Sequence, residues 1–457
     1  MAGIILTADI GTSSLKAAFV DLDGRLLCFS RIAYAADSDG KVDSSAWLHA
    51  FALALGRLYG EAPGTVVDGI CFSGNGPTLV PVTAGGKALS PLYWHDRRVI
   101  PSPKGARSFF LPRAAWVKHN APEIYSEIDT FISSHEWLAY ELGADALTVL
   151  PQGSYVPFYW DDDQCDLFQL DRKKFPPFIR SGTVMGNLSV EAAASLGPFT
   201  GGRLKSGTPF IAGGPDFITA LIGTGVSRIG EVCDRSGTSE GINYCASLPV
   251  DSSGVRVFPH AMEGLWNIGA VIPSSGRLFE WYRSFTGQDD VGYGDHLAEL
   301  IPLPIDVNLF NNSFFFHPSS PESYPQSLHH HDKTKLGRAV LCAMGFAVRE
   351  AAGVLESRGF HFREMRVSGG QCKNSRWNRL KADITGLTLE VPEIPDGELA
   401  GNAVLAALAL GAVSNLEEGM AGMIRFRDVY SPQSDRAAFW DERYRLYVED
   451  KPPEGVP

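Results

Sequence analysis

The chain has 457 residues, of which 44% are hydrophobic and 20% charged, as is typical of a globular protein of about two or three domains. Its net charge of −12 argues against nucleic acid and anionic membranes as partners. The seven cysteines include no Cys-x-x-Cys pair, which argues against a disulfide scaffold or a zinc site. No window approaches the ~18 apolar residues of a membrane span, and the N-terminus reads as a strand rather than a signal peptide. We therefore expect a soluble, cytoplasmic protein.

The beginning of the chain predicts strands joined by tight turns. Three apolar, β-branched runs predict strands: 3–9, 15–21 and 26–34. Asp23 and Gly24 predict the hairpin turn before the third of them. Residues 44–60 have helical spacing, with Ser44 or Ser45 as the N-cap, and residues 67–74 read as a further buried strand. Hairpins followed by alternating helix and strand are typical of an α/β domain.

Polar residues gather in the turn between the first two predicted strands. Asp9 lies at the end of the first strand, Gly11, Thr12 and Ser13 form the turn, and Lys16 follows it. Such a turn can present N–H groups and hydroxyls to an anion, a carboxylate there can hold a hydrated Mg²⁺, and a lysine can neutralise phosphate. The same residue types are common in plain hairpin turns, so both interpretations stay open at this point.

The middle of the chain gives weaker signals. Residues 112–143 read as helices with loops, and residues 154–170 form an aromatic and acidic segment. Its most acidic part, 160–166, is interpreted as a loop. A polar segment over 305–335 also reads as a loop, and its HHHD sequence at 329–332 is interpreted as solvated rather than metal-bound.

The opening arrangement recurs in the second half of the chain. An apolar segment leads into Gly237, Thr238 and Ser239, and another apolar segment follows. Two such turns, one near the start of each half, predict a duplicated α/β architecture with a boundary near residues 225–230. The later predicted elements are a helix over 335–359, a strand over 364–370 and helices over 375–386 and 399–413.

A tight turn made by Gly213, Gly214 and Pro215 leads into a predicted helix, which places Asp216 at or near its N-cap. Capping a helix is a common role for aspartate, and from the residues alone it is the favoured interpretation. The N-terminus of a helix also favours the ionised carboxylate, which could then accept a proton.

Three segments together resemble the FGGY family of carbohydrate kinases: TADIGTSSLKAAFVD (7–21), SGTS (236–239) and VSGGQCKNSRWNRLKADITG (367–386). The family, which includes xylulose kinases, is similar to actin and hexokinase. The resemblance implies an α/β fold with two actin-like (ribonuclease H-like) domains, 1–227 and 228–457, and an interdomain cleft that holds Mg-ATP. It also implies ATP-dependent phosphorylation of a small-molecule sugar or polyol, and many relatives form homodimers.

The resemblance also implies roles for individual residues. GGPDFITALIGTG (213–225) resembles the catalytic segment, with Asp216 as the general base. The implied nucleotide-side residues are Asp9 (holding Mg²⁺ through water), Gly11, Thr12, Ser13, Lys16, Gly237, Thr238, Gly276, Gly369, Gly370 and Asn374. The implied substrate-side residues are Asn75, Gly76, Trp94, Asp96 and Asp216. Two alternatives remain, because Asn374 could cap a helix and Asp96 could form a surface ion pair with Arg97 or Arg98.

The chain departs from its relatives after the strand that ends at residue 74. Xylulose kinases carry Met-His there and glycerol kinases Arg-Glu, whereas this chain has Asn75, Gly76, Pro77 and Thr78. The resemblance implies a ketopentose, ketohexose, deoxysugar or polyol as the substrate. The departure argues against glycerol and puts ordinary xylulose kinase activity in question. It also motivates an alternative, a sugar- or nucleotide-binding module without catalysis. Another actin-like ATPase is the second alternative.

Overall fold

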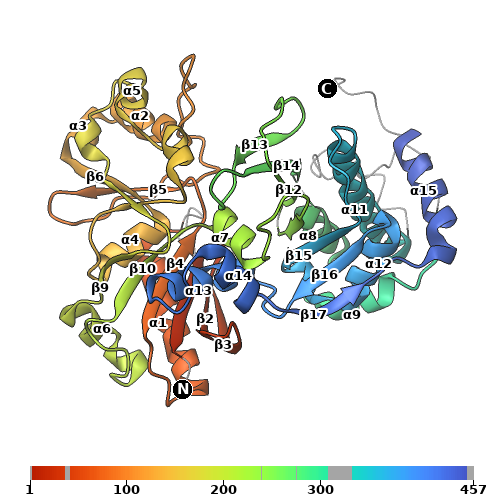
Figure 1. Cartoon of the computed structure of the whole chain (residues 1–457), viewed down its shortest axis with the longest axis horizontal. Coiled ribbons are helices and arrows are strands. Elements are labelled where there is room, and N and C mark those ends of the chain that lie inside the picture. The colour runs from red at the N-terminus through yellow and green to blue at the C-terminus, as the bar shows by residue number, and fades with distance from the viewer. Residues whose placement is uncertain (1–2, 36–41, 238, 274, 307–331, 450–457) are drawn as a thin grey trace. The chain divides into compact units, whose positions relative to one another are not determined.

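The computed structural model describes residues 3–35, 42–237, 239–273, 275–306 and 332–449 (Figure 1). Their contacts divide the chain into two compact units. The first unit comprises Met1–Gly225, Ala261–Glu263 and Asp396–Arg425, and the second comprises Val226–His260, Gly264–Pro395 and Phe426–Pro457. The chain first crosses from the first unit to the second after residue 225. The return of residues 396–425 to the first unit was not expected.

The first unit is built on a mixed β-sheet. In spatial order, its described strands are β3 (Leu26–Ala33), β2 (Ser14–Asp21), β1 (Ile4–Ile10), β4 (Gly69–Gly74), β10 (Pro209–Pro215) and β9 (Val184–Asn187). The three central strands β1, β4 and β10 run parallel, so their carboxyl ends meet at one edge of the sheet. The other three strands pair antiparallel with their neighbours.

The second unit repeats this arrangement. In spatial order, its described strands are β13 (Arg256–Pro259), β14 (Trp266–Ile272), β12 (Glu240–Ala246), β11 (Val232–Ser236), β15 (Glu364–Gly369), β16 (Thr388–Pro392) and β17 (Phe426–Tyr430). As in the first unit, an antiparallel meander leads to one strand that begins a parallel set, here β11, β15 and β16. The duplicated α/β architecture predicted from the two glycine-hydroxyl turns is therefore confirmed.

Helix α1 (Ser44–Glu61) covers the first sheet because its apolar residues recur at helical spacing, and Trp47, Phe51 and Leu55 are fully buried in the core. Its N-cap is Asp43, whose carboxylate accepts from the Ser45 N–H at 3.3 Å. The prediction that Ser44 or Ser45 caps this helix was wrong by one or two positions.

Helices α7 (Asp216–Gly223) and α13 (Gly397–Ala409) explain why residues 396–425 belong to the first unit. Glycine allows their backbones to touch, since a Cβ added at Gly223 would overlap the Gly397 carbonyl and one at Gly401 would overlap the Thr219 carbonyl. Figure 1 shows α13, drawn in blue, beside α7 and β4, which come from much earlier in the chain. This seam fixes α13 against the strands whose carboxyl ends carry the candidate site.

The remaining described elements of the first unit are β5 (Leu79–Thr83), α2 (Leu111–Asn120), α3 (Pro122–Glu127), β6 (Ile128–Ser133), α4 (Ser134–Glu141), β7 (Thr148–Leu150), η1 (Gly153–Phe158), α5 (Asp162–Leu167), η2 (Arg172–Lys174), β8 (Phe178–Arg180), α6 (Val190–Thr200) and α14 (Leu416–Met423). Two expectations for this region were wrong. Strand β6 interrupts the helices expected over 112–143, because it pairs with β5. The acidic stretch 160–166 contains helix α5, because Asp161 caps it by accepting from Gln164 N at 2.7 Å.

The described helices of the second unit are α8 (Ser275–Thr286), α9 (Tyr293–Leu300), α11 (Lys333–Glu356), η5 (Gln371–Lys373), α12 (Ser375–Thr385), η6 (Ser434–Arg436) and α15 (Ala437–Glu449). Asp332 caps α11, and the histidines at 329–331 lie outside the described residues. All seven cysteines are free and buried. Among the described helices, not one is both long enough and apolar enough to span a bilayer.

Candidate active site

The candidate site of the first unit begins where the parallel strands end. Asp9 is the last residue but one of β1, Ser73 is its register partner on β4, and Asp216 directly follows β10. The Ser73 hydroxyl donates to Asp9 Oδ1 at 2.9 Å. The topology therefore brings together two carboxylates that lie more than 200 positions apart in the sequence, as the resemblance implies.

Asp9 is almost completely buried, with 3% of its surface exposed. Burial raises the pKa of the Asp9 carboxyl to about 7, and the negative charges of Glu398 and Asp216 add to this rise. The positive charge of Lys16 and the hydrogen bond from Ser73 act in the opposite direction. Asp9 therefore titrates near neutral pH, and a cation placed beside it would strongly stabilise its ionised form.

Lys16 is held by two carboxylates that the sequence did not point to. Its Nζ lies 3.0 Å from Asp396 Oδ1 and 3.7 Å from Glu398 Oε2, at the start of α13. Burial alone would lower the pKa of Lys16, but Glu398, Asp396 and Asp9 outweigh burial and raise it. Much of the charge of Lys16 is therefore offset within the protein. The only sequence signal for this pairing is the Asp-Gly-Glu run that opens a helix.

These residues fit a hydrated Mg²⁺ better than a directly bound ion. Asp9, Glu398 and Asp216 offer hard oxygen ligands and a negative field around a single lysine. Yet among the described residues no group of three or more acidic, histidine or cysteine side chains has metal-binding geometry. Mg²⁺ commonly keeps several waters and takes one or two protein carboxylates, which is the mode that this arrangement allows.

The turn that follows Asp9 is narrow and exposed. Gly11 N donates to Ser14 O at 3.1 Å, and a Cβ at Gly11 would lie 2.9 Å from that oxygen, so the turn favours glycine there. Thr12 and Ser13 are exposed, and the Trp94 Nε1–H donates to Thr12 Oγ1 at 3.2 Å. A predicted substrate residue therefore touches a predicted phosphate-binding residue.

Asp216 is the first residue of α7, and Pro215 occupies the N-cap position. The helix has no side-chain hydrogen bond at its cap. The interpretation of Asp216 as the capping residue was therefore wrong, because the turn ends one residue earlier than a cap at Asp216 requires. The carboxylate nevertheless lies in the first turn, where the helix dipole favours negative charge.

Two of the predicted substrate residues have structural partners. The Asn75 Nδ2 donates to Ile10 O at 2.9 Å, and its Oδ1 accepts from the Thr78 hydroxyl, so its buried amide ties the end of β4 to the end of β1. Asp96 forms a two-pronged ion pair with Arg98, whose Nε donates to Asp96 Oδ2 at 2.9 Å. This pairing agrees with the ion-pair interpretation of Asp96. Hydrogen bonds from Arg98 lower the pKa of Asp96 despite its partial burial. Gly76 has room for a Cβ, 3.5 Å from Pro215.

Arg113 of α2 holds the segment that carries Trp94 in place. Its buried guanidinium donates to the Tyr93 carbonyl at 2.9 Å and also to the Trp94 carbonyl. These bonds fix the backbone of the segment that carries Trp94 and Asp96. The exposed Trp94 ring is thus presented by a rigid turn rather than by a loose loop.

In the second unit, the corresponding turn joins β11 to β12. Gly237 N donates to Ser239 O at 2.8 Å, and a Cβ at Gly237 would meet only this oxygen, at 3.6 Å. Thr238 lies outside the described residues. Gly276 is the second residue of α8.

Gly369 is the last residue of β15, Gly370 follows it, and Asn374 lies further on at the start of α12. Asn374 Oδ1 accepts from Arg376 N at 3.0 Å and Trp377 N at 3.1 Å, so the residue is the N-cap of α12. Capping the helix and contacting adenosine are compatible roles for Asn374, because the cap uses the side-chain oxygen and leaves the amide nitrogen for the nucleotide.

Gly369 and Gly370 form a matched pair for mutagenesis. Gly369 has φ +95°, and a Cβ there would overlap the Ser236 carbonyl, whereas Gly370 is in the α region with no atom within 4 Å of an added Cβ. We expect Gly369→Ala to lower the free energy of unfolding by about 2–4 kcal/mol, and Gly370→Ala to change it by less than about 0.5 kcal/mol. Urea denaturation of both variants measures the difference. If Gly370→Ala keeps its stability but binds ATP more weakly, the empty space beside Gly370 accommodates nucleotide.

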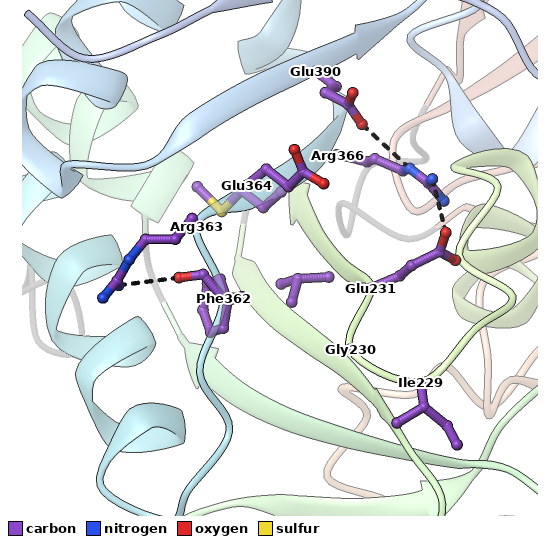
Figure 2. A pocket seen from close by; sticks show the side chains of 10 residues that line it. Ile229, Gly230, Glu231, Phe362, Arg363, Glu364, Arg366 and Glu390 are labelled. Atoms are coloured by element: carbon purple, nitrogen blue, oxygen red, sulfur yellow. Dashed lines mark hydrogen bonds and ion pairs between the residues drawn. The ribbon is translucent and has the colours of Figure 1, made fainter.

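A cavity of about 510 Å³ also lies in the second unit (Figure 2). It is lined by residues 229–232 and 362–366 and by Glu390, at the starts of β11 and β15. In Figure 2 Arg366 lies between two carboxylates, 2.9 Å from Glu231 and 3.4 Å from Glu390. The segments that resemble nucleotide-binding motifs follow the opposite ends of these strands. The cavity is therefore not the predicted nucleotide site.

Comparison with known proteins decides the family. The sequence profile of the N-terminal domain of the FGGY family of carbohydrate kinases matches residues 106–223, and the profile of the C-terminal domain matches residues 235–410. The chain belongs to the FGGY family of carbohydrate kinases. As an FGGY kinase it is a phosphotransferase, and membership of this family implies ATP-dependent phosphorylation of a sugar.

Individual FGGY relatives are distant but extend over most of the chain. A xylulose kinase of Staphylococcus epidermidis is 24% identical in an alignment 490 positions long, which covers 97% of this chain and 95% of that protein. An autoinducer-2 kinase of Salmonella paratyphi B is 24% identical over 379 residues, with 75% of this chain and 69% of that protein covered. The solved structure of ligand-bound xylulose kinase from Lactobacillus acidophilus superposes with a TM-score of 0.78 at 18% identity, over 98% and 97% of the two chains. This likeness confirms the prediction of an α/β fold with two actin-like domains.

Proposed function

We propose that this FGGY kinase transfers the γ-phosphoryl group of Mg-ATP to one hydroxyl of a sugar or polyol, with Asp216 as the general base. The observation that carries the proposal is the meeting of Asp9 and Asp216 at the carboxyl edge of three parallel strands. Ligands of open α/β sheets bind at that edge. A carboxylate for the hydrated metal and a carboxylate for the acceptor hydroxyl are then present in one unit.

Asp216 would orient the acceptor hydroxyl and accept its proton on a carboxylate oxygen. A weak base is sufficient because phosphoryl transfer passes through a loose transition state, in which positioning and charge neutralisation provide most of the rate. Mg-ATP, when bound, supplies the phosphoryl group and a divalent charge. Asp9 would hold the hydrated metal, because a neighbouring cation would stabilise the ionised form of this buried carboxylate.

The other predicted residues take roles that their surroundings allow. The exposed hydroxyls of Thr12 and Ser13 would donate to phosphate oxygens. Lys16 would act mainly by holding Asp396 and Glu398 near Asp9, because they already offset much of its charge. In the second unit, the turn at Gly237 would approach phosphate, and the segment from Gly369 to Asn374 would contact adenosine.

We propose a substrate with several hydroxyls and an apolar ring or chain face. Trp94 is 42% exposed beside Thr12, and an indole in this position can stack on the apolar face of a sugar. Asp96, although paired with Arg98, would accept from substrate hydroxyls, and Gly76 would leave room for the substrate. Asn75 would contribute through the shape of the backbone, since its amide is bonded to Ile10 and Thr78.

A coupled assay of ADP release tests the proposal across a panel of ketopentoses, ketohexoses, deoxysugars and polyols. We expect ADP formation to depend on one class of these compounds and on Mg²⁺. ADP formation at full rate without any sugar would instead indicate another kind of ATPase. Sugar binding without ADP formation would indicate a module that lacks catalysis.

A further inference from the structure

Three charged side chains are almost completely buried in the second unit, beside the turn at Gly237. Lys381 of α12 places its Nζ 2.6 Å from Asp234 Oδ2 and 2.5 Å from Glu240 Oε1. Their exposed fractions are 1%, 0% and 2%. Asp234 and Glu240 lie on either side of the turn at Gly237. Asp234 lies on β11, three residues before Gly237, and Glu240 is the first residue of β12.

Glu240 uses its second oxygen to reach other segments. The Ser275 hydroxyl, at the start of α8, donates to Glu240 Oε2 at 2.5 Å. Ser275 in turn accepts from Gln371 Nε2 at 3.2 Å, and the same nitrogen lies 3.5 Å from Gly237 O. The chain of contacts closes into a ring, because Gly237 and Glu240 belong to one hairpin.

We propose that Glu240 is a positioning residue for the nucleotide. Its carboxylate joins the turn at Gly237, the start of α8 beside Gly276 and the segment that follows Gly370 into one rigid group. These are the three segments of the second unit that resemble nucleotide-binding motifs, so the inference rests on the proposed function. It assigns a role to Glu240, Ser275 and Gln371, which the sequence did not single out.

Stability alone does not account for this arrangement. Burying three charges costs free energy, and an apolar cluster of the same volume often stabilises a fold as well or better. Moreover, Lys381 already has one carboxylate partner in Asp234, so Glu240 adds a second carboxylate, and burial together with Glu240 raises the pKa of Asp234 to about 8. What Glu240 does add is a hydrogen bond across to α8, which an apolar residue could not make.

The test is calorimetric titration of the full chain with ADP in the presence of Mg²⁺. Ser275→Ala breaks the ring without changing a charge, and Glu240→Ala breaks it while leaving the neutral pair of Lys381 and Asp234. We expect each variant to bind ADP about tenfold more weakly, the loss typical of a charge-assisted hydrogen bond. We expect the double variant to bind no more weakly than either single one, because both changes open the same ring.

Arg283→Met is the matched control. Arg283 lies further along α8, is buried, and donates to the carbonyls of Asp289 and Val291, so its loss destabilises the same helix without touching the ring. This control should melt at a lower temperature yet bind ADP normally. Normal ADP affinity in Ser275→Ala and Glu240→Ala, or equally weak affinity in the control, would overturn the positioning role alone. A wild-type chain that binds no ADP would overturn the proposed function as well.

Discussion

Asp216→Asn should turn over its sugar about 10²–10⁴-fold more slowly than the wild-type protein, with the KM values for sugar and ATP changed by less than about threefold. The amide keeps the size of the side chain and its place in the first turn of α7, but it cannot accept the proton of the acceptor hydroxyl. Initial rates with the sugar identified by the panel, measured at saturating ATP, give both parameters.

The competing explanation for Asp216 is a purely electrostatic role at the start of its helix. Loss of that role would cost only about 0.3–1 kcal/mol of stability and would leave the rate nearly unchanged. Thermal unfolding of the same variant separates the two. A slightly lower melting temperature combined with near-normal turnover would remove Asp216 from the mechanism.

The second large effect is expected at Asp9, where activity and stability should move in opposite directions. Asp9→Asn removes the carboxylate proposed to hold the metal, and we expect turnover to fall at least about a hundredfold. The same change should stabilise the protein at pH 8, by about 1–4 kcal/mol, because it removes a buried charge from a cluster with an excess of carboxylates.

The raised pKa of Asp9 determines how the stability gain of Asp9→Asn changes with pH. The pKa of Asp9 is raised to about 7 in the folded protein, so between pH 4 and pH 7 the folded state holds a proton that the unfolded state has released. Stability contributed by this group therefore falls as pH rises through that window and is constant above it. The gain in Asp9→Asn should be absent near pH 4, grow up to about pH 7 and then level off, as measured by urea denaturation without nucleotide.

Asp21→Asn is the control for Asp9. Asp21 is a buried carboxylate at the far end of β2, where it accepts from the Asp23 and Arg25 amides at 3.0 Å and 2.8 Å. Its amide variant keeps Oδ1 as an acceptor but loses the negative charge that strengthens these hydrogen bonds, so it should lower stability slightly and keep activity. Stabilisation in both variants, or in neither, would contradict the account of Asp9.

Much of this architecture could be predicted from local patterns. Alternating and continuous apolar runs gave β1, β2, β3 and β4 to within two residues, since strand burial follows directly from side-chain periodicity. Strand β6 was not predicted because its pairing with β5 overrides a sequence that also suits a helix. Local strand and helix propensities contain no information about a pairing partner that lies about 50 residues away in the sequence.

The site was less predictable than the fold, for a similar reason. Motifs pointed to Asp9 and Asp216, and the strand topology explains why they meet. Asp396 and Glu398 could not be found in this way, because their role depends on α13 returning to the first unit. Two further features depend on differences of one residue in turn geometry. Pro215, and not Asp216, occupies the N-cap position of α7, and Asp96 pairs with Arg98.

The seam between α7 and α13 has a consequence for biosynthesis. During translation residues 1–225 emerge first, yet the glycines at 397 and 401 that complete their packing are made only after residues 226–395, most of which belong to the second unit. A nascent polypeptide that stops before residue 396 lacks both acidic partners of Lys16 and the helix that packs against β1, β4 and β10. The first unit thus cannot complete its packing on the ribosome until the second unit has been synthesised as far as residue 395.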